Sequence, residues 1–209
     1  MPLNHNYSDP DNRVVRAEVS LVGIEPAISR TLELLRATNL AELHGVLQAA
    51  FGWTDSHLHR FDIGGLDYGP PEHGSDDDDA RRTFEASDVR LADLAFDYGI
   101  PTIIRYEYDL GDSWMHRLSM TLEPRDPDAP YPRCLAGSRS APPEDAGGPH
   151  SYPELLDAWS DPGHPEHAAV RRWTGRRFDP ERFDLAATNK AITSAVRRAK
   201  GSYAHRRSR

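Results

Sequence analysis

The chain has 209 residues but a single cysteine, Cys134. One thiol cannot form an intrachain disulfide, and it cannot build a four-thiolate zinc site within one chain. Long apolar runs are also missing, since no segment approaches the ~18–20 apolar residues of a membrane-spanning helix. The chain does not open with a basic-then-apolar export signal. These absences predict a protein of the reducing cytoplasm that does not enter a membrane.

Several well-known motifs are absent as well. The sequence contains no glycine-rich phosphate loop, no nucleophile elbow, no zinc-finger spacing and no internal repeat. Hydrophobic residues make up 38% of the chain and prolines number 17, which indicates one compact domain with much loop. We expect a flexible N-terminus at residues 1–12, a single domain at 13–198 with an acidic mobile insertion at 64–82, and a basic flexible tail at 199–209.

Charge is unevenly distributed along the chain. The last twenty residues hold seven Lys and Arg and no acid, and subtracting their +7 from the total of −8 leaves −15 on the first 189 residues. A basic tail can contact nucleic acid or an anionic partner, or dock on its own acidic body. The acidic body would repel phosphate over any larger footprint. Nucleic acid is therefore a possible partner through the tail, but not the favoured one.

Hydrophobic periodicity predicts the secondary structure. Alternating apolar residues predict strands at 13–23, 28–35, 57–63 and 103–110, with a return strand that begins at Trp114. An i, i+3, i+4, i+7 pattern predicts a helix at 40–51, begun by a capping box of Asn39 and Glu42 and ended by Gly52. Further helices are expected at 90–96, 152–159, 165–173 and 180–198, the last with Asp179 as its cap.

These elements predict a single-domain α+β fold with a mainly antiparallel sheet of about five strands. The helix at 40–51 should pack across one face of the sheet, as in a β-grasp-like core, with the C-terminal helices on a flank.

The densest chemistry lies in the segment YEYDLGDSWMH, residues 106–116. It indicates the end of a β-hairpin whose turn is LGDS, with Gly111 free to take positive φ. Asp109, Asp112 and His116 should then cluster, and they are candidates for catalysis because a carboxylate beside an imidazole can move a proton. In the structural alternative Asp112 caps the turn, Asp109 holds its backbone and His116 is merely paired.

The segment YPRCLAGSRSAPPEDAGGP, residues 131–149, is a loop by composition. Its thiol is a further catalytic candidate, because Cys134 would be a nucleophile if His116 or His150 acted as its base. A free cysteine is also commonly a small buried hydrophobe, so both interpretations stay open.

Both segments are rich in groups that need partners, so we expect them to pack together around a groove. The ligand-binding candidates are two aromatic, two basic and two acidic residues: Tyr108, Trp114, Arg133, Arg139, Glu144 and Asp145. We expect an arginine of this set to pair with an acid from Asp109, Asp112, Glu144 or Asp145. The pair would lock the loop or bind a small anionic ligand.

No metal site and no cofactor is predicted. His57 and His59 lie two residues apart on an expected strand and could share a metal. No further ligand lies nearby in the sequence, so a partly buried, hydrogen-bonded pair is preferred. The four aspartates at 76–79 indicate a solvated acidic loop, because EF-hand positions are absent. With one cysteine and scattered histidines, we expect no structural zinc.

The segments at 106–116 and 131–149 closely resemble the plasmid pRiA4b ORF-3-like family, which is also labelled as an insertion-element passenger protein of TnpR type. LAELHGVLQAAFGWTDSHLHRFDI and FDPERFDLAATN resemble it too, so the resemblance runs from about residue 14 to residue 189. The chain departs from the family where PAISRT replaces a typical Pro-x-Ile-Trp-Arg-Arg run and GPHSY replaces a typical GGPxGY. The resemblance implies an α+β domain without an established activity.

Two function classes follow. We interpret the chain as a non-enzymatic binding or accessory module with a groove between the hairpin and the proline-rich loop, and with a protein or a small anion as its partner. The family label implies an association with plasmid or mobile-element biology. The alternative is a hydrolase-like enzyme that uses the Asp, His and Cys side chains of that groove. Serine recombinase chemistry is not expected, because such an enzyme needs a serine nucleophile set among activating arginines, a setting that Arg30 lacks, and because no helix-turn-helix module is evident.

Overall fold

The computed structural model describes residues 12–70, 83–97 and 99–206. These residues form one eight-stranded sheet with the order β5-β4-β3-β6-β7-β1-β2-β8, in which every neighbouring pair is antiparallel except β4 and β5. The strands are β1 (Arg13–Leu21), β2 (Ser29–Leu35), β3 (His59–Ile63), β4 (Leu66–Gly69), β5 (Thr83–Glu85), β6 (Thr102–Tyr108), β7 (Trp114–Pro124) and β8 (Arg133–Ser138). The predicted α+β class with a mainly antiparallel sheet is confirmed.

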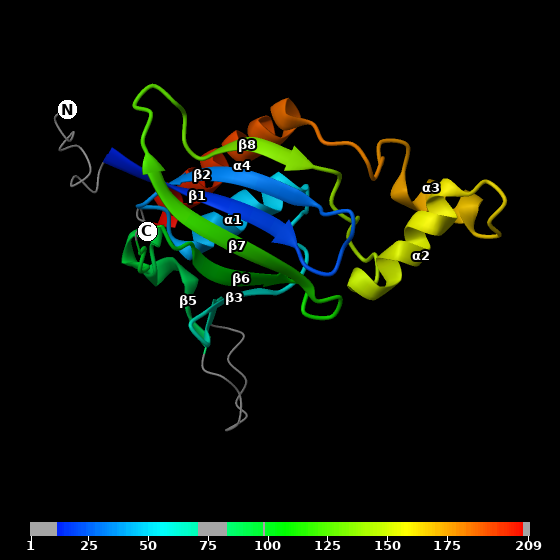
Figure 1. The fold of residues 1–209 in the computed structure, drawn as a ribbon, viewed down its shortest axis with the longest axis horizontal. Helices are drawn as coiled ribbons and strands as arrows, with labels where there is room; N and C mark the ends of the chain where they lie inside the picture. The colour runs from blue at the N-terminus through cyan, green and yellow to red at the C-terminus, as the bar shows by residue number, and fades with distance from the viewer. Residues whose placement is uncertain (1–11, 71–82, 98, 207–209) are drawn as a thin grey trace.

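The helices lie on one face of the sheet and beyond one of its ends (Figure 1). They are α1 (Leu40–Phe51), α2 (Gly148–Ser160), α3 (His167–Thr174) and α4 (Leu185–Arg206). α4 contacts both α1 and β8, whereas α2 and α3 pack on each other beyond one end of the sheet. The core lies between α1 and the sheet, where Leu43, Leu47, Phe61 and Leu118 are fully buried.

The boundaries of α1 follow the local sequence. Asn39 Oδ1 accepts a hydrogen bond from the backbone N–H of Glu42 (2.8 Å), and Glu42 Oε2 accepts one from the N–H of Asn39 (3.1 Å). Gly52 ends the helix in the left-handed region with φ 81°. The predicted capping box and glycine stop are therefore both confirmed.

The central hairpin also follows its pattern. β6 and β7 pair antiparallel with Tyr106 opposite His116. Trp114, His116, Leu118 and Met120 alternate along β7 and are all buried, which confirms that they share one face. That face is the one covered by α1.

The expected number of strands, about five, is too low. Residues 66–69, predicted as part of a mobile insertion, form β4, and residues 71–82 lie outside the described part of the chain. Residues 133–138, predicted as loop from their composition, form β8 against β2. The strands β4, β5 and β8 are short and are defined by their pairing partners, so their own residues carry little periodic signal.

Two helix predictions also need correction. The helix expected at 90–96 is reduced to the 3₁₀ turn η5 (Leu91–Asp93), which follows η4 (Ala86–Asp88). The last helix begins at Leu185 rather than at 180, with Asp184 Oδ1 accepting from the N–H of Ala187 (2.9 Å). The hydroxyl of Ser140 lies 2.7 Å from the carbonyl oxygen of Asp179 and 2.8 Å from that of Arg182, and its N–H donates to the carbonyl of Pro180 (3.0 Å), so the turn at 179–182 packs against Ser140.

In the described part of the chain, no helix is both long enough and apolar enough to cross a membrane. The backbone of α4 continues to Arg206, so it includes most of the expected basic tail. Residues 1–11 and 207–209 lie outside the described ranges.

Candidate functional site

The turn between β6 and β7, residues 109–113, is held by the side chain of Asp109. Its Oδ1 accepts from the backbone N–H groups of Gly111 (3.0 Å) and Asp112 (3.2 Å). Asp109 and Ser113 adopt left-handed φ values of 56° each. The turn cap is therefore Asp109 rather than Asp112, and Gly111 does not supply the positive φ that the sequence led us to expect.

Asp112 joins the hairpin to the proline-rich loop, which we define as residues 139–147. Its Oδ2 accepts from the N–H of Gly147 (2.8 Å). Gly148 has φ 77°, and a Cβ there would collide with the carbonyl oxygen of Asp112. The prediction that the hairpin end and this loop pack together is confirmed.

Glu144 joins the proline-rich loop to the connection between α1 and β3 through hydrogen bonds. Its Oε1 accepts from the N–H of Thr54 (2.8 Å), from the Thr54 hydroxyl (3.0 Å) and from the hydroxyl of Tyr108 (3.1 Å). Burial raises the pKa of Tyr108, which keeps this phenol a donor. Trp53 stacks on Tyr108 and donates its Nε1–H to the carbonyl of Pro142 (3.0 Å). The Glu144 carboxylate is thus held by three hydrogen bonds, two from Thr54 and one from Tyr108.

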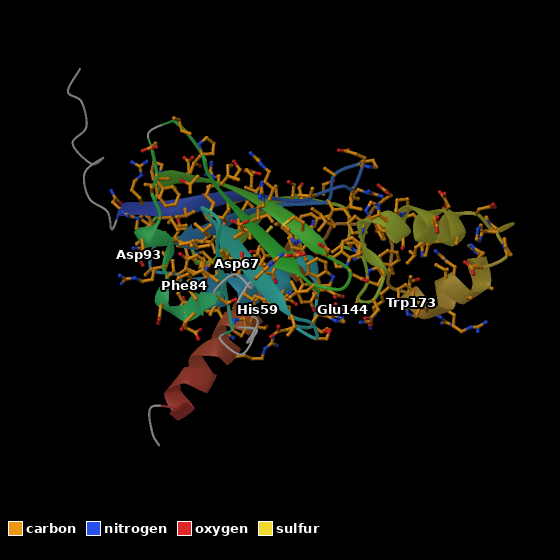
Figure 2. The ribbon with its side chains drawn as sticks, turned by 90° about the horizontal axis from the view of Figure 1, so that it is seen from below. His59, Asp67, Phe84, Asp93, Glu144 and Trp173 are labelled. Atoms are coloured by element: carbon orange, nitrogen blue, oxygen red, sulfur yellow. The ribbon has the colours of Figure 1, made fainter. Side chains whose placement is uncertain are left out.

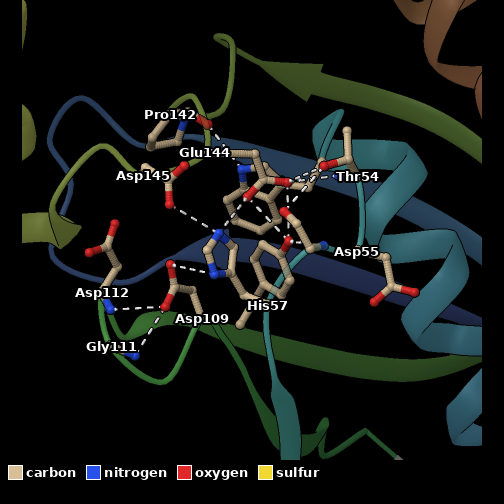
Figure 3. A network of polar contacts seen from close by, with 12 residues as sticks. Thr54, Asp55, His57, Asp109, Gly111, Asp112, Pro142, Glu144 and Asp145 are labelled. Carbon is tan, nitrogen blue, oxygen red and sulfur yellow. Dashed lines mark hydrogen bonds and ion pairs between the residues drawn. The ribbon is translucent and has the colours of Figure 1, made fainter.

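His57 lies among three carboxylates at this convergence (Figure 3). Its Nδ1 is 3.5 Å from Asp109 Oδ2, and its Nε2 is 3.2 Å from Asp145 Oδ1 and 3.8 Å from Glu144 Oε2. Nε2 is sealed from solvent, yet it makes no hydrogen bond with any described residue. We call His57, Asp109, Glu144 and Asp145 the junction site.

The junction site combines buried and exposed ligand atoms. Asp109 is buried, whereas the side chain of Asp145 is 74% exposed. One ligand atom from each of His57, Asp109 and Asp145 lies within 4.8 Å of the others. Imidazole nitrogen and carboxylate oxygen both ligate divalent metals, and the exposed Asp145 gives an ion a route from solvent. Figure 2 places Glu144 near the end of the sheet that faces α2 and α3.

The remaining catalytic candidates lie elsewhere. His116 is fully buried under α1, with its ring edge-on to Phe51 and Trp53 and its Nδ1 3.2 Å from the carbonyl of Tyr106. Burial lowers the pKa of His116 to about 4. The imidazole is therefore uncharged at neutral pH and packed as part of the core.

Cys134 lies on β8 and faces α4. Its N–H donates to the side chain of Asn189 (2.8 Å), its thiol donates to the carbonyl of Ala136, and it is buried. Burial raises the pKa of the Cys134 thiol, which disfavours the reactive thiolate. The structure does not bring Cys134 together with Asp109 or Asp112.

The expected pairing of the loop arginines is wrong in its partners. Arg133 forms an ion pair with Glu33 on β2 (2.6 Å), and Arg139 forms one with Glu181 (2.6 Å). Both acids come from segments other than the hairpin and the loop. Trp114, the last binding candidate, is buried with its ring edge-on to Tyr152 of α2, so it anchors α2 and does not line a groove.

A sequence profile described as plasmid pRiA4b ORF-3-like protein matches residues 13–187. The chain belongs to this family. The match covers the sheet, α1 and all four residues of the junction site, and it ends at the start of α4.

Two proteins similar to this family member are themselves uncharacterised. "Uncharacterized protein y4hQ" of Sinorhizobium fredii (strain NBRC 101917 / NGR234) is 36% identical over 182 residues, which cover 86% of this chain and 90% of that protein. A crystal structure titled as a protein of unknown function, MM3350 from Methanosarcina mazei Go1, superposes with a TM-score of 0.72 at 31% identity. That likeness covers 83% of this chain and 96% of the other.

His57 lies at the centre of this site, but the sequence suggested a role for it only together with His59. In the structure the two histidines enter different clusters, His57 with the junction carboxylates and His59 against His44. The carboxylates around His57 lie on the hairpin and the proline-rich loop, far along the chain. The predicted packing of these two segments was the only sequence evidence that pointed to this site. It did not show which histidine the two segments would enclose.

Proposed function

We propose that the protein is a binding module whose ligand is a divalent cation held at the junction site. One observation carries the proposal: the sealed, unbonded Nε2 of His57 faces the carboxylates of Asp145 and Glu144 at 3.2 and 3.8 Å. A cation between these atoms would satisfy the imidazole nitrogen and neutralise part of the negative charge.

The surrounding contacts suit such a role. Asp109 faces the other nitrogen of His57 at 3.5 Å, which is how carboxylates commonly orient a metal-binding imidazole. The backbone N–H of Thr54 and the hydroxyl of Tyr108 orient Glu144. His57, Asp109 and Glu144 are held in place and Asp145 is exposed, so the junction site is open to solvent. Such a site differs from a closed four-ligand zinc site, which the sequence does not predict.

A cation has better support as the ligand than the small anion suggested by the sequence. The two arginines expected to bind an anion are engaged by Glu33 and Glu181. The groups that converge at the junction are carboxylates around one imidazole. An anion would meet repulsion there, whereas a cation would be attracted.

Isothermal titration of metal-free protein with Mn²⁺ and Zn²⁺ tests the proposal. Asp145→Asn should weaken binding at the junction by at least about tenfold, and its exposed position leaves the fold intact. Asp128→Asn removes the same charge from an exposed turn and is the control. His57→Gln, matched with His150→Gln, gives the second comparison. Equal affinities for Asp145→Asn and Asp128→Asn, or no uptake of either ion, would overturn the proposal.

A second function, hydrolase-like acid–base catalysis, is favoured by one contact. Asp109 lies 3.5 Å from Nδ1 of His57, so His57 takes the part that the sequence assigned to His116. A carboxylate in this place holds an imidazole ready to accept a proton at its other nitrogen. Hydrolysis of p-nitrophenyl acetate or p-nitrophenyl phosphate by wild type, abolished in His57→Gln and retained in His150→Gln, would support it.

The cellular setting is part of the proposal. A cytoplasmic location is supported by the single cysteine, which excludes intrachain disulfides. An association with plasmid or mobile-element biology rests on the description of the family.

A further inference from the structure

A second cluster of metal-binding side chains lies beside α1 and does not share a residue with the junction site. It consists of His44 on α1, Asp55 in the connection, and His59 at the start of β3. One ligand atom from each of the three lies within 4.8 Å of the others. Both histidines are buried. Their rings stack with centroids 3.5 Å apart and an angle of 7° between their planes, so one ring must turn before both can present an in-plane nitrogen to the same ion.

We propose that His44, Asp55 and His59 form a second metal site, open to solvent, that takes a first-row transition metal of the Zn²⁺ or Co²⁺ type. Two imidazoles with one carboxylate form a ligand set that such ions favour, and Mg²⁺ and Ca²⁺ prefer oxygen ligands. The junction site offers one nitrogen among carboxylates, so the two sites should differ in metal preference.

The surroundings orient His44 for this role. Its Nδ1 lies 2.8 Å from the hydroxyl of Tyr106, and its Nε2 lies 2.8 Å from Asp55 Oδ1. Gln48 donates to the same hydroxyl from Nε2 (3.0 Å). His44 thus has the Tyr106 hydroxyl at Nδ1 and the Asp55 carboxylate at Nε2, and an ion that displaces a proton from Nε2 would lie between His44 and Asp55. A hydrogen bond at the far nitrogen is the usual way in which a protein fixes a ligating histidine.

Asp55 provides the solvent side of the cluster. Its backbone is left-handed with φ 58°, and its N–H donates to Gln48 Oε1 (2.8 Å). The side chain is 62% exposed and borders a surface hollow that Gln48, Thr54 and Arg198 also line. An ion can therefore reach the two buried imidazoles past Asp55.

The junction site and the second cluster both use residues of the short segment 55–59, but on different sides of it. In Figure 3 the carboxylate of Asp55 is turned away from His57 and from the carboxylates of the hairpin and the loop. Asp55 and His59 therefore serve one site, and His57, which lies between them in sequence, serves the other. The two sites can be emptied one at a time by substitution.

Co²⁺ titration followed by visible absorption and calorimetry tests this inference. We expect Asp55→Asn and His59→Gln to lose the equivalent that gives the nitrogen-rich Co²⁺ spectrum, with at least tenfold weaker binding. His150→Gln and Asp128→Asn, both exposed, should bind as wild type does. Asp55→Asn guards against misfolding, because its side chain is largely exposed whereas His59 is buried.

The outcomes separate the two proposals. A Co²⁺ equivalent lost in Asp55→Asn but kept in Asp145→Asn supports the second site by itself. An equivalent lost only in Asp145→Asn overturns this inference and leaves the junction site standing. If wild type takes up no Co²⁺ or Zn²⁺, or if Asp55→Asn and His59→Gln bind both ions as wild type does, the second site is wrong.

Discussion

His116 brings an ionisable imidazole into the core. Burial lowers its pKa from 6.5 to about 4, so between pH 6.5 and about 4 the imidazole binds a proton in the unfolded chain and stays neutral in the folded protein. Falling pH therefore favours unfolding. The stabilising contribution is complete above pH 6.5, and about 3 kcal/mol is lost between pH 6.5 and about 4.

Urea unfolding at pH 7, 6, 5 and 4 measures this loss. His116→Gln should cost on the order of 1–3 kcal/mol at pH 7, and its stability should then fall less steeply with acid than that of wild type. His150→Gln, at an exposed position, should keep the wild-type slope. A His116→Gln variant that also keeps this slope would assign the acid sensitivity to other groups.

The same residue shows what a sequence pattern can decide. Alternation predicted that His116 shares a face with Trp114, and this is correct. Alternation does not say whether that face lines a cleft or a core, because both are shielded from bulk water. His57 was harder still, since its carboxylate neighbours come from other segments and only tertiary packing brings them within reach.

Gly148 is the backbone position on which the hairpin–loop contact depends. Its φ of 77° strains any L side chain, and a Cβ would strike the carbonyl of Asp112. We expect Gly148→Ala to lower the free energy of unfolding by at least about 2 kcal/mol. Gly45→Ala is the matched control: its Cβ would meet nothing within 4 Å, and alanine inside a helix should stabilise by about 0.5–1 kcal/mol. Chemical denaturation that finds both variants equally stable would contradict this view of the junction.

Elements were predictable where their signals are local. The start and end of α1 depend on residues within one turn, Asn39, Glu42 and Gly52, and they were predicted correctly. The strands β4, β5 and β8 depend on partners elsewhere, and β8 also lies in a segment rich in proline and glycine. The start of α4 was misplaced because Asp179 and Asp184 each accept a backbone N–H, Asp179 from Glu181 in a turn and Asp184 from Ala187 in the helix. A capping residue in the sequence therefore does not by itself say which of the two begins the helix.

Across the whole molecule, burial is concentrated in the sheet and α1. Eight residues of α1 are buried, whereas α3, all eight of whose residues are described, has none. α2 is anchored to the sheet chiefly by Tyr152, which packs on Trp114. Elements with few buried contacts open locally at a small cost in free energy, and core strands exchange their amides only on global unfolding. The boundary between the well-packed part of the molecule and the part that opens locally therefore lies between the sheet and α3. The junction site lies in the well-packed part.

Hydrogen exchange measured by mass spectrometry can test this boundary and the junction site together. Amides of α3 should exchange at least about a thousandfold faster than those of β1 and β7, because local opening avoids most of the global cost. Saturating Mn²⁺ should slow exchange in residues 53–57, 109–113 and 139–147, since a bound ion joins these segments and stabilises only the folded state. It should leave residues 167–174 unchanged, and Asp145→Asn should remove the effect. Equal slowing in α3, or slowing that survives in Asp145→Asn, would show that the ion acts somewhere other than the junction.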